Sequence, residues 1–272
     1  MATQEKIGLL AGIGFLPIDF ARAARGMGFH VTAIGLVPDV EAILPENADK
    51  YFQISAGKIN KIIKTLKKEG VTTAVMLGKV SKEVLYKGFG LDFRAVKLLL
   101  SLPNRSDDTI MLAIVAELEK EGIKVMEQTR LLSILTPPAG VLSRRAPTEE
   151  EAKDIDYGFK MALAAGQLDI GQTVVVKNQA IMAVEAIEGT DACIKRGGIL
   201  GGEGVVVAKT AKPGQDFRFD MPSVGLETIK SMVGAGAKTL VVEAGRTLFV
   251  QKEEALRLAD KYGIAIVARA KE

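Results

Sequence analysis

The 272-residue sequence has few of the residue types that many functional sites require. His30 and Cys193 are its only histidine and cysteine, which excludes a disulfide within the chain and the usual ligands of a zinc site. Tryptophan is absent, aromatic residues make up 5%, and the net charge is +3, so no nucleic-acid partner is expected. No run reaches the roughly 20 apolar residues of a membrane span, and no secretory signal begins the sequence. These absences predict a cytoplasmic protein.

Apolar residues make up 48% of the sequence, enough for substantial cores. From Lys6 to Met126 short apolar runs alternate with helical patterns, which predicts a parallel sheet covered by helices. Residues 133–147 are rich in proline and are expected to form a linker. The predicted organisation is α/β throughout, with a Rossmann-like parallel-sheet domain over residues 1–132. A mixed α/β domain over residues 148–272 is expected to follow, with a cleft between the two.

Two glycines follow the first predicted strand. Gly12 and Gly14 precede a helix that opens at Pro17, an arrangement in which backbone amides and a helix N-terminus can approach a phosphate. The GxGxxG fingerprint of dinucleotide-binding proteins is not matched, because Pro17 stands at the third glycine position. A loop for another polar ligand and a simple strand-to-helix turn both remain open.

Two further features of the first domain stand near predicted strand and helix ends. Gly78-Lys79 follows the strand Thr73–Leu77, at the carboxyl end where open α/β sheets bind ligands. Asp107-Asp108-Thr109 is expected to cap a helix over Ile110–Glu121.

The second domain is predicted to contain a hairpin followed by an acidic turn. Thr173–Lys177 and Ile181–Ala186 flank Asn178-Gln179-Ala180, a pattern typical of a hairpin. Three carboxylates follow, and Thr190 or Asp191 is expected to cap a short helix over residues 192–195, before a flexible glycine-rich loop, Arg196–Gly204. Such a turn suits a hard divalent cation or a polar group of a substrate. The alternative is a capped surface turn with solvated carboxylates.

Charged residues recur at predicted strand ends farther along. Lys209 and Glu243 each end a strand, and Lys212 opens a turn. Asp216–Asp220 alternates so that its phenylalanines face a core and Asp220 faces away. Carboxylates near lysines predict a site for a metal and a phosphorylated ligand. Magnesium suits these ligands, with manganese as the alternative.

Several motifs together resemble the LpxI family, the UDP-2,3-diacylglucosamine pyrophosphatases of Gram-negative lipid A synthesis. They are IGLLAGIGFLP, LGKVSK, the DDT helix cap, VVVKNQAIMAVEAIEGTD and KPGQDFRFDMPSVGLETI, in the family's order over essentially the whole chain. The resemblance implies magnesium-dependent hydrolysis of UDP-2,3-diacylglucosamine to UMP and 2,3-diacylglucosamine 1-phosphate. It also implies two domains that hold the lipid-linked sugar between them.

The match at FDMPSVG puts Asp220 on the family's essential acidic residue, as a base or a metal ligand. Residues expected to contact substrate are Gly12, Gly14, Gly78, Lys79, Asp108, Lys177, Gln179, Gly189, Thr190, Lys209, Lys212, Pro222 and Gly225. Those expected to bind the metal are Asp220, Glu185, Glu188 and Asp191.

Two other functions fit the same residues. One is a non-catalytic nucleotide or lipid carrier, and the other is a sugar-nucleotide transferase. The acyl chains of the implied substrate predict transient contact with the inner membrane surface. The basic and apolar stretch 93–105 is the candidate contact, and a homo-oligomer remains open.

Overall fold

The computed structural model describes residues 4–80, 90–104, 106–128 and 135–270, which group into two compact units. The first unit comprises Met1–Leu131 together with Phe217–Phe219. The second comprises Leu132–Asp216 and Asp220–Glu272. Three residues from late in the sequence therefore belong to the first unit, and the chain re-enters the second unit at Asp220.

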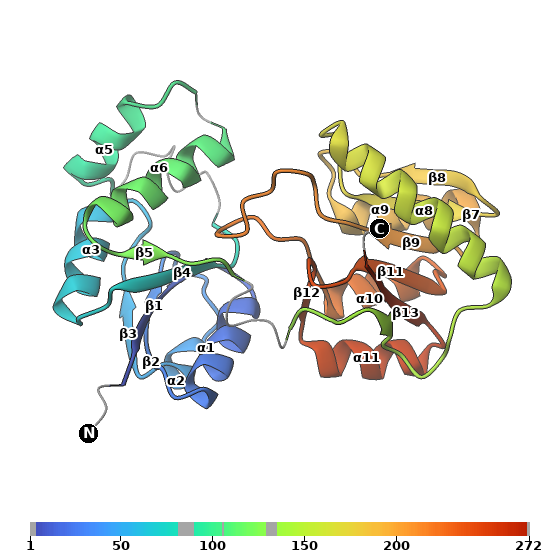
Figure 1. Cartoon of the computed structure of the whole chain (residues 1–272), viewed down its shortest axis with the longest axis horizontal. Helices are drawn as coiled ribbons and strands as arrows, with labels where there is room; N and C mark the ends of the chain where they lie inside the picture. The colour runs from blue at the N-terminus through green and yellow to red at the C-terminus, as the bar shows by residue number, and fades with distance from the viewer. Residues whose placement is uncertain (1–3, 81–89, 105, 129–134, 271–272) are drawn as a thin grey trace. The chain divides into compact units, whose positions relative to one another are not determined.

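The first unit is built on a five-stranded, fully parallel sheet of order β3-β2-β1-β4-β5 (Figure 1). Its elements are β1 (Lys6–Ala11), α1 (Leu16–Gly26), β2 (His30–Gly35), α2 (Leu44–Asn47), β3 (Lys50–Gln53), α3 (Ile59–Lys68), β4 (Thr73–Leu77), α5 (Phe93–Leu100), α6 (Asp107–Lys120) and β5 (Lys124–Val125). This strand order matches the first five strands of the 3-2-1-4-5-6 order of a Rossmann fold. The predicted parallel sheet is confirmed, although β3 was not foreseen.

One face of this sheet packs against α3, α5 and α6. The core on that face joins Leu10, Ile34 and Met76 of the strands to Leu66 of α3 and Leu118 of α6. The central strands β1, β2 and β4 are almost continuously buried, as strands covered on both faces require. The sheet therefore forms the rigid base on which its carboxyl-end loops are placed.

The second unit contains a mixed sheet of order β6-β13-β11-β9-β7-β8 and a small parallel pair, β10-β12. Its elements are β6 (Gly140–Val141), α8 (Glu149–Gln167), β7 (Thr173–Lys177), β8 (Ala180–Val184), α9 (Thr190–Gly201), β9 (Val206–Lys209), β10 (Ser223–Gly225), α10 (Leu226–Gly234), β11 (Thr239–Glu243), β12 (Leu248–Val250), α11 (Lys252–Lys261) and β13 (Ala265–Arg269). The expected α/β class is confirmed for this unit as well.

Helices cover both faces of the mixed sheet (Figure 1). On one face α8 packs through Ile155 and Phe159 against alternate residues of β7, β9 and β11. On the other face α9, α10 and α11 pack against the intervening residues, with Ile194, Met232 and Ala255 in the core. Successive side chains of a strand point to opposite faces of the sheet, so each strand contributes to both cores.

The longest of these helices, α8, begins with a capping box. The side chain of Thr148 accepts from the Glu151 amide at 3.2 Å, and the Glu151 carboxylate accepts from the Thr148 amide at 2.8 Å. None of the helices in the described ranges, α8 included, combines the length and the apolar composition needed to cross a membrane.

The predicted linker 133–147 is not a separate segment where it is described. β6 pairs with β13, and the Ser143 hydroxyl accepts from the Ile266 amide at 2.7 Å. The carbonyl of Leu135 accepts from Phe249 N at 2.8 Å. The proline-rich composition was misleading because carbonyl groups and an edge strand can bond to the sheet without proline amides. Residues 133 and 134 lie outside the described ranges.

The predicted flexible loop Arg196–Gly204 is also wrong, because α9 continues to Gly201. Its glycines allow close helix packing. A Cβ on Gly197 would lie 2.5 Å from Val175 Cβ, and one on Gly198 would lie 2.4 Å from the carbonyl oxygen of Ala235. The residues that predicted a loop therefore bring α9 onto β7 and α10.

Candidate active site

Charged residues gather at one edge of the mixed sheet. β9 and β11 are parallel, and β7 is antiparallel to both β8 and β9, so the carboxyl ends of β8, β9 and β11 share this edge. Glu185 follows β8, Lys209 ends β9 and Glu243 ends β11. Their exposed fractions are 8%, 6% and 1%. Charged groups this deeply buried require specific partners.

Lys209 is joined to Glu185 through the hydroxyl of Thr190. Lys209 Nζ donates to Thr190 Oγ1 at 2.9 Å, and Thr190 Oγ1 donates to Glu185 Oε1 at 2.9 Å. A hydroxyl can do both at once, because it has one proton and two lone pairs. Lys209 Nζ also donates to the carbonyl of Ser223 at 3.0 Å. The ammonium thus holds the ends of β8 and β9, the start of α9 and the start of β10 together.

Asp220 lies on a short segment three residues before Ser223, whose carbonyl accepts from Lys209. The Asp220 amide donates to the carbonyl of Asp216 at 2.9 Å, and its Oδ2 accepts from Gln215 Nε2 at 2.9 Å. The Gln215 side chain is itself oriented, because its Oε1 accepts from the Lys212 amide at 2.8 Å. Asp220 is exposed, whereas Pro222 just after it is buried and its carbonyl accepts from the Leu248 amide at 2.8 Å. The carboxylate is therefore accessible while the chain on either side is anchored.

The other predicted metal ligands have protein partners of their own. Glu188 forms an ion pair with Arg196, whose hydrogen bond lowers the pKa of the Glu188 carboxyl. Asp191 accepts from the Ser231 hydroxyl at 3.0 Å. Glu185 Oε2, in contrast, is buried and has no hydrogen-bond partner among the described residues. No three His, Cys, Asp or Glu side chains within the described ranges lie close enough to hold a metal ion.

Lys177 and Gln179 lie at the opposite edge of the sheet from Lys209, although all three are predicted to contact the same substrate. The register pairs Thr173 with Lys209, so β7 ends at Lys177 far from the end of β9. Lys177 Nζ donates to the Glu203 carbonyl at 2.8 Å. Local patterns located the strand ends but not the strand directions, and an antiparallel neighbour ends at the opposite edge.

The predicted hairpin is confirmed, and Gln179 lies in the turn at its tip. Asn178 and Gln179 have φ values of 51° and 56°, the left-handed pair of a type I′ turn. Their amides donate to the two oxygens of the buried Asp154 carboxylate at 2.9 and 2.6 Å. Gln179 is thus part of a turn that Asp154 holds in place.

In the first unit, the loops after β1 and β4 form one corner. Gly12 N donates to the Leu77 carbonyl at 2.8 Å, and Ile13 and Lys79 exchange backbone hydrogen bonds at 2.8 and 2.9 Å. A Cβ on Gly12 would lie 2.4 Å from the Lys79 carbonyl oxygen. Gly12 therefore serves this close approach, and its amide is already bonded rather than turned to a phosphate. At Gly14, which has a φ of 111°, a Cβ would meet no atom within 4 Å, so this side of the corner is open.

The remaining predicted contacts are spread over several elements. Lys212 Nζ donates to Asp169 Oδ1 at 2.9 Å, which lowers the pKa of that carboxyl. Gly189, with a φ of 84°, is the residue before the first turn of α9, so the cap is neither Thr190 nor Asp191 as predicted. Gly225 is buried where α10 begins, and a Cβ there would lie 2.6 Å from the Val250 carbonyl oxygen. In the first unit, Gly78 and Lys79 are exposed.

Asp108 lies exposed in the first turn of α6. That helix begins at Asp107, earlier than predicted, and its cap is Ser106, whose hydroxyl accepts from the Thr109 amide at 3.3 Å.

Two residues that hold the chain around Asp220 were missed from sequence. Gln215 orients Asp220, and its position in the KPGQD turn, five residues before Asp220, was the available signal. Gln128 is buried, and its amide donates to the Phe217 carbonyl at 2.8 Å within the first unit. This bond helps to keep Phe217–Phe219 in that unit, directly before Asp220. No local pattern could reveal a pair so far apart in sequence.

Comparison with known proteins identifies the family to which these elements belong. The LpxI N-terminal domain matches residues 6–135, and the LpxI C-terminal domain matches residues 138–267. The chain belongs to the LpxI family. A curated relative, UDP-2,3-diacylglucosamine pyrophosphatase LpxI of Caulobacter vibrioides, is 34% identical over 278 residues that cover 97% of each chain. The resemblance seen in the motifs is therefore confirmed for LpxI over nearly the whole length.

Two solved structures that match parts of the chain have much lower sequence identity to it. Pyruvate carboxylase of Rhizobium etli is 16% identical with a TM-score of 0.30, and the match covers 63% of this chain and 15% of that one. The N5-carboxyaminoimidazole ribonucleotide synthetase of Thermotoga maritima is 15% identical with a TM-score of 0.25, covering 68% and 42%. The chain spans less than half the length of either protein. Such low similarity carries no argument about the LpxI site.

Proposed function

We propose that this chain hydrolyses the pyrophosphate bond of UDP-2,3-diacylglucosamine to UMP and 2,3-diacylglucosamine 1-phosphate in lipid A biosynthesis. The observation that carries the proposal is membership of the LpxI family over both domains, with a relative named as this pyrophosphatase matched over 97% of its length. Asp220 stands in the FDMPSVG motif and is an exposed carboxylate on an anchored segment.

We propose that Asp220 orients the attacking water or takes its proton. A pyrophosphate resists hydrolysis because its anionic oxygens repel a nucleophile. A carboxylate within hydrogen-bond reach of a water can orient it or take its proton. The water oxygen bonds to one phosphorus, and the bond from that phosphorus to the bridging oxygen breaks. Gln215 fixes one carboxylate oxygen of Asp220. The side chain therefore has fewer orientations to lose when the transition state forms.

Replacing Asp220 by asparagine tests this role. The variant keeps the size of the side chain, so we expect kcat to fall at least about 100-fold because the acid–base group is lost. The free energy of unfolding should change by less than about 1 kcal/mol, because Asp220 is exposed and has one neutral donor at its carboxylate. Glu253→Gln, at an exposed carboxylate in the first turn of α11, is the matched control. A variant that melts early but turns over normally would remove Asp220 from the active site.

We propose that the activity depends on Mg²⁺, with Mn²⁺ as a substitute. The four carboxylates predicted as ligands do not form a protein-only metal site, because Glu188 and Asp191 bond to Arg196 and Ser231. Magnesium is commonly held by one or two carboxylates together with substrate phosphates, and Asp220 suits this arrangement. A bound ion would neutralise charge on the pyrophosphate. Full activity after EDTA treatment and removal of the chelated metal would refute the dependence.

One assay separates the proposed reaction from the two alternatives. The purified chain is incubated with UDP-2,3-diacylglucosamine and Mg²⁺ in water without an added acceptor. We expect release of UMP in equal amount to 2,3-diacylglucosamine 1-phosphate. Binding without UMP release would favour a carrier, and UMP release only after addition of a sugar or lipid acceptor would favour a transferase.

We further propose that the protein works in the cytoplasm and meets its substrate at the surface of the inner membrane. The support is the chemistry of the substrate, because two acyl chains keep it in a bilayer. Cell fractionation at increasing salt tests this proposal. Cells are broken and membranes are sedimented at each ionic strength. Recovery of all the protein in the supernatant at the lowest ionic strength would contradict a surface contact.

A further inference from the structure

Helix α5 exposes an apolar side that the described residues of the first unit do not cover. Phe93 is 84% exposed, Leu100 76% and Val96 39%. These residues stand at positions i, i+3 and i+7, so they share one face of the helix. Ala95 and Leu98, on the other face, are buried in the core. Large apolar side chains exposed together on one short helix mark an interaction surface.

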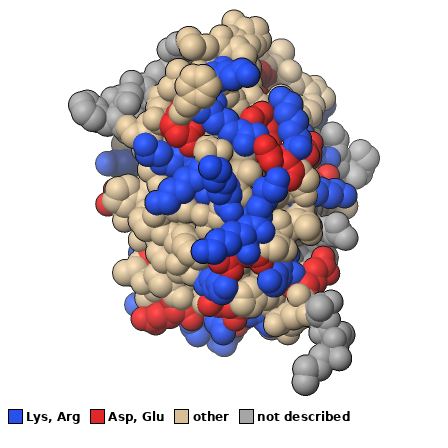
Figure 2. All heavy atoms as spheres, turned by 90° about the vertical axis from the view of Figure 1, so that its left-hand side faces the viewer, with Lys and Arg blue, Asp and Glu red and all other residues tan. Residues whose placement is uncertain are grey.

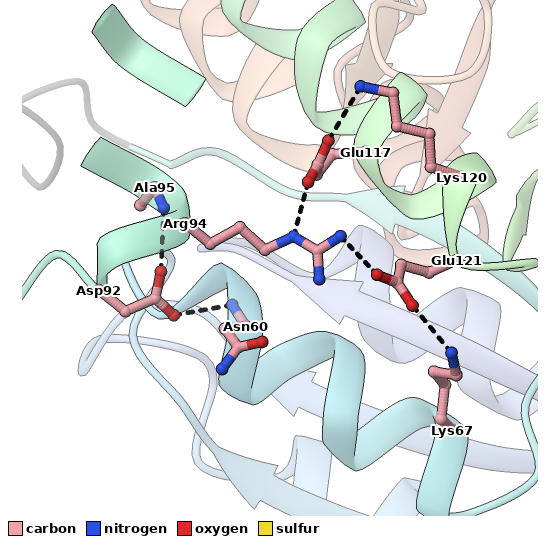
Figure 3. A network of polar contacts seen from close by, with 8 residues as sticks. All are labelled: Asn60, Lys67, Asp92, Arg94, Ala95, Glu117, Lys120 and Glu121. Carbon is pink, nitrogen blue, oxygen red and sulfur yellow. Dashed lines mark hydrogen bonds and ion pairs between the residues drawn. The ribbon is translucent and has the colours of Figure 1, made fainter. Parts of the chain in front are cut away.

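Polar contacts hold α5 in this orientation (Figure 3). Asp92 caps the helix by accepting from the Ala95 amide at 2.9 Å, and its other oxygen accepts from the Asn60 amide of α3 at 2.7 Å. Arg94 donates to Glu117 of α6 and to Glu121, the residue that follows α6, each at 2.6 Å.

Arg94 is thus bound to α6 and is not part of the expected membrane contact. The pKa of the Arg94 guanidinium is raised despite its desolvation, because the two carboxylates stabilise the charge. Asp92 and Arg94 thus bond inward and fix the helix, which leaves Phe93, Val96 and Leu100 in solvent.

Basic side chains are exposed on α5 itself and on α3, the helix that packs on it. α3 packs on α5, and its exposed lysines are Lys61, Lys64, Lys67 and Lys68, with no acidic residue in the helix. α5 contributes the exposed Lys97 and likewise has no acidic residue. Figure 2 shows the side at the left of Figure 1, where α3 lies, and Lys and Arg side chains form a band across it. Apolar residues next to a basic band complement an anionic lipid surface.

We propose that the α5 face, defined by Phe93, Val96 and Leu100, docks on an anionic bilayer, with Lys61, Lys64 and Lys97 against the lipid headgroups. A second copy of the chain is a poorer occupant, because a two-fold contact would bring like-charged lysines together. The proposal rests on the proposed function, since a membrane-held substrate gives a reason for docking. It goes beyond that function by naming the face.

Flotation with vesicles of phosphatidylcholine containing about 30% phosphatidylglycerol tests the docking face. Phe93→Ser/Leu100→Ser should lower the partition coefficient at least about 10-fold. Ile199→Ser/Leu200→Ser, at similarly exposed positions on α9, is the matched control and should bind as the unaltered chain does. Equal loss in both variants, or no loss in the first, would overturn the proposal.

A second variant tests the role of the lysines. Lys61→Gln/Lys64→Gln should lower binding to the anionic vesicles at least about 5-fold and reduce its salt dependence, whereas binding to pure phosphatidylcholine should not change. Lys195→Gln, on α9, is the control for removing an exposed charge. Unchanged binding of the Lys61/Lys64 variant would refute the role of the lysines.

Activity on detergent-dispersed substrate separates this proposal from the proposed function. The Phe93/Leu100 variant should hydrolyse dispersed substrate at the unaltered rate but act more slowly on substrate in vesicles. Loss of activity on dispersed substrate with normal vesicle binding would mean that this face binds acyl chains, which overturns docking. If neither the unaltered chain nor the variant hydrolyses the substrate, the proposed function fails. The docking face still stands if the Phe93/Leu100 variant binds vesicles more weakly than the unaltered chain.

Discussion

The buried network of Lys209, Thr190 and Glu185 allows a quantitative prediction. Lys209→Met removes two hydrogen bonds from a charged donor and leaves the Glu185 carboxylate, 8% exposed, without the cation across the Thr190 hydroxyl. Each lost bond would cost about 1.5–3 kcal/mol, but the cost of burying the ammonium disappears as well. Removal of one partner of a buried charge pair typically costs about 3–5 kcal/mol, and we expect a loss in this range.

Hydrogen exchange of backbone amides is the suitable assay, because it reports the free energy of opening for each unit separately. Amides of β9 and β11 should lose about 3–5 kcal/mol of protection in Lys209→Met, whereas those of β1 in the first unit serve as the internal reference and should not change. Glu185→Gln/Lys209→Met should be more stable than the sum of the single losses by at least about 1 kcal/mol. Additive losses would refute the idea that the two buried charges stabilise each other through Thr190.

Three further predictions concern other parts of the chain. Gly12→Ala should cost about 1–3 kcal/mol in thermal unfolding, because its Cβ would lie 2.4 Å from the Lys79 carbonyl oxygen, whereas Gly26→Ala, with no atom within 4 Å, should be neutral or slightly stabilising; equal effects would contradict the close packing of the two loops. Hydrogen bonds from Lys67 and Arg94 lower the pKa of Glu121 from 4.5 to about 2, so their stabilisation is present above pH 4.5 and lost as pH falls through about 2. The Tm difference between Lys67→Met and the unaltered chain should therefore shrink over that interval, and a constant difference would refute the linkage. Burial raises the pKa of the Cys193 thiol to about 12, so a thiol reagent should label it at neutral pH only after unfolding; rapid labelling of the native chain would show that the thiol is not enclosed.

Local patterns in the sequence determined most of the secondary structure and the family. Apolar runs can be recognised over short windows of sequence, so the strands Thr73–Leu77 and Thr173–Lys177 were predicted with the bounds of β4 and β7. The hairpin at Asn178-Gln179 followed from two β-rich arms and a polar turn. The FDMPSVG motif identified Asp220 because a family motif keeps residue type and spacing together.

Only the tertiary structure decided which of these elements meet. The antiparallel direction of β7 moved Lys177 away from Lys209, and the packing of α9 turned a predicted loop into a helix. Phe217–Phe219 joined the first unit through contacts with residues such as Gln128, about 90 positions earlier in the chain. Arg94, expected at the surface, bonds to α6 while Phe93 beside it remains exposed. Strand direction, helix rotation and long-range pairing depend on free energies summed over the whole fold, so no short window of sequence contains them.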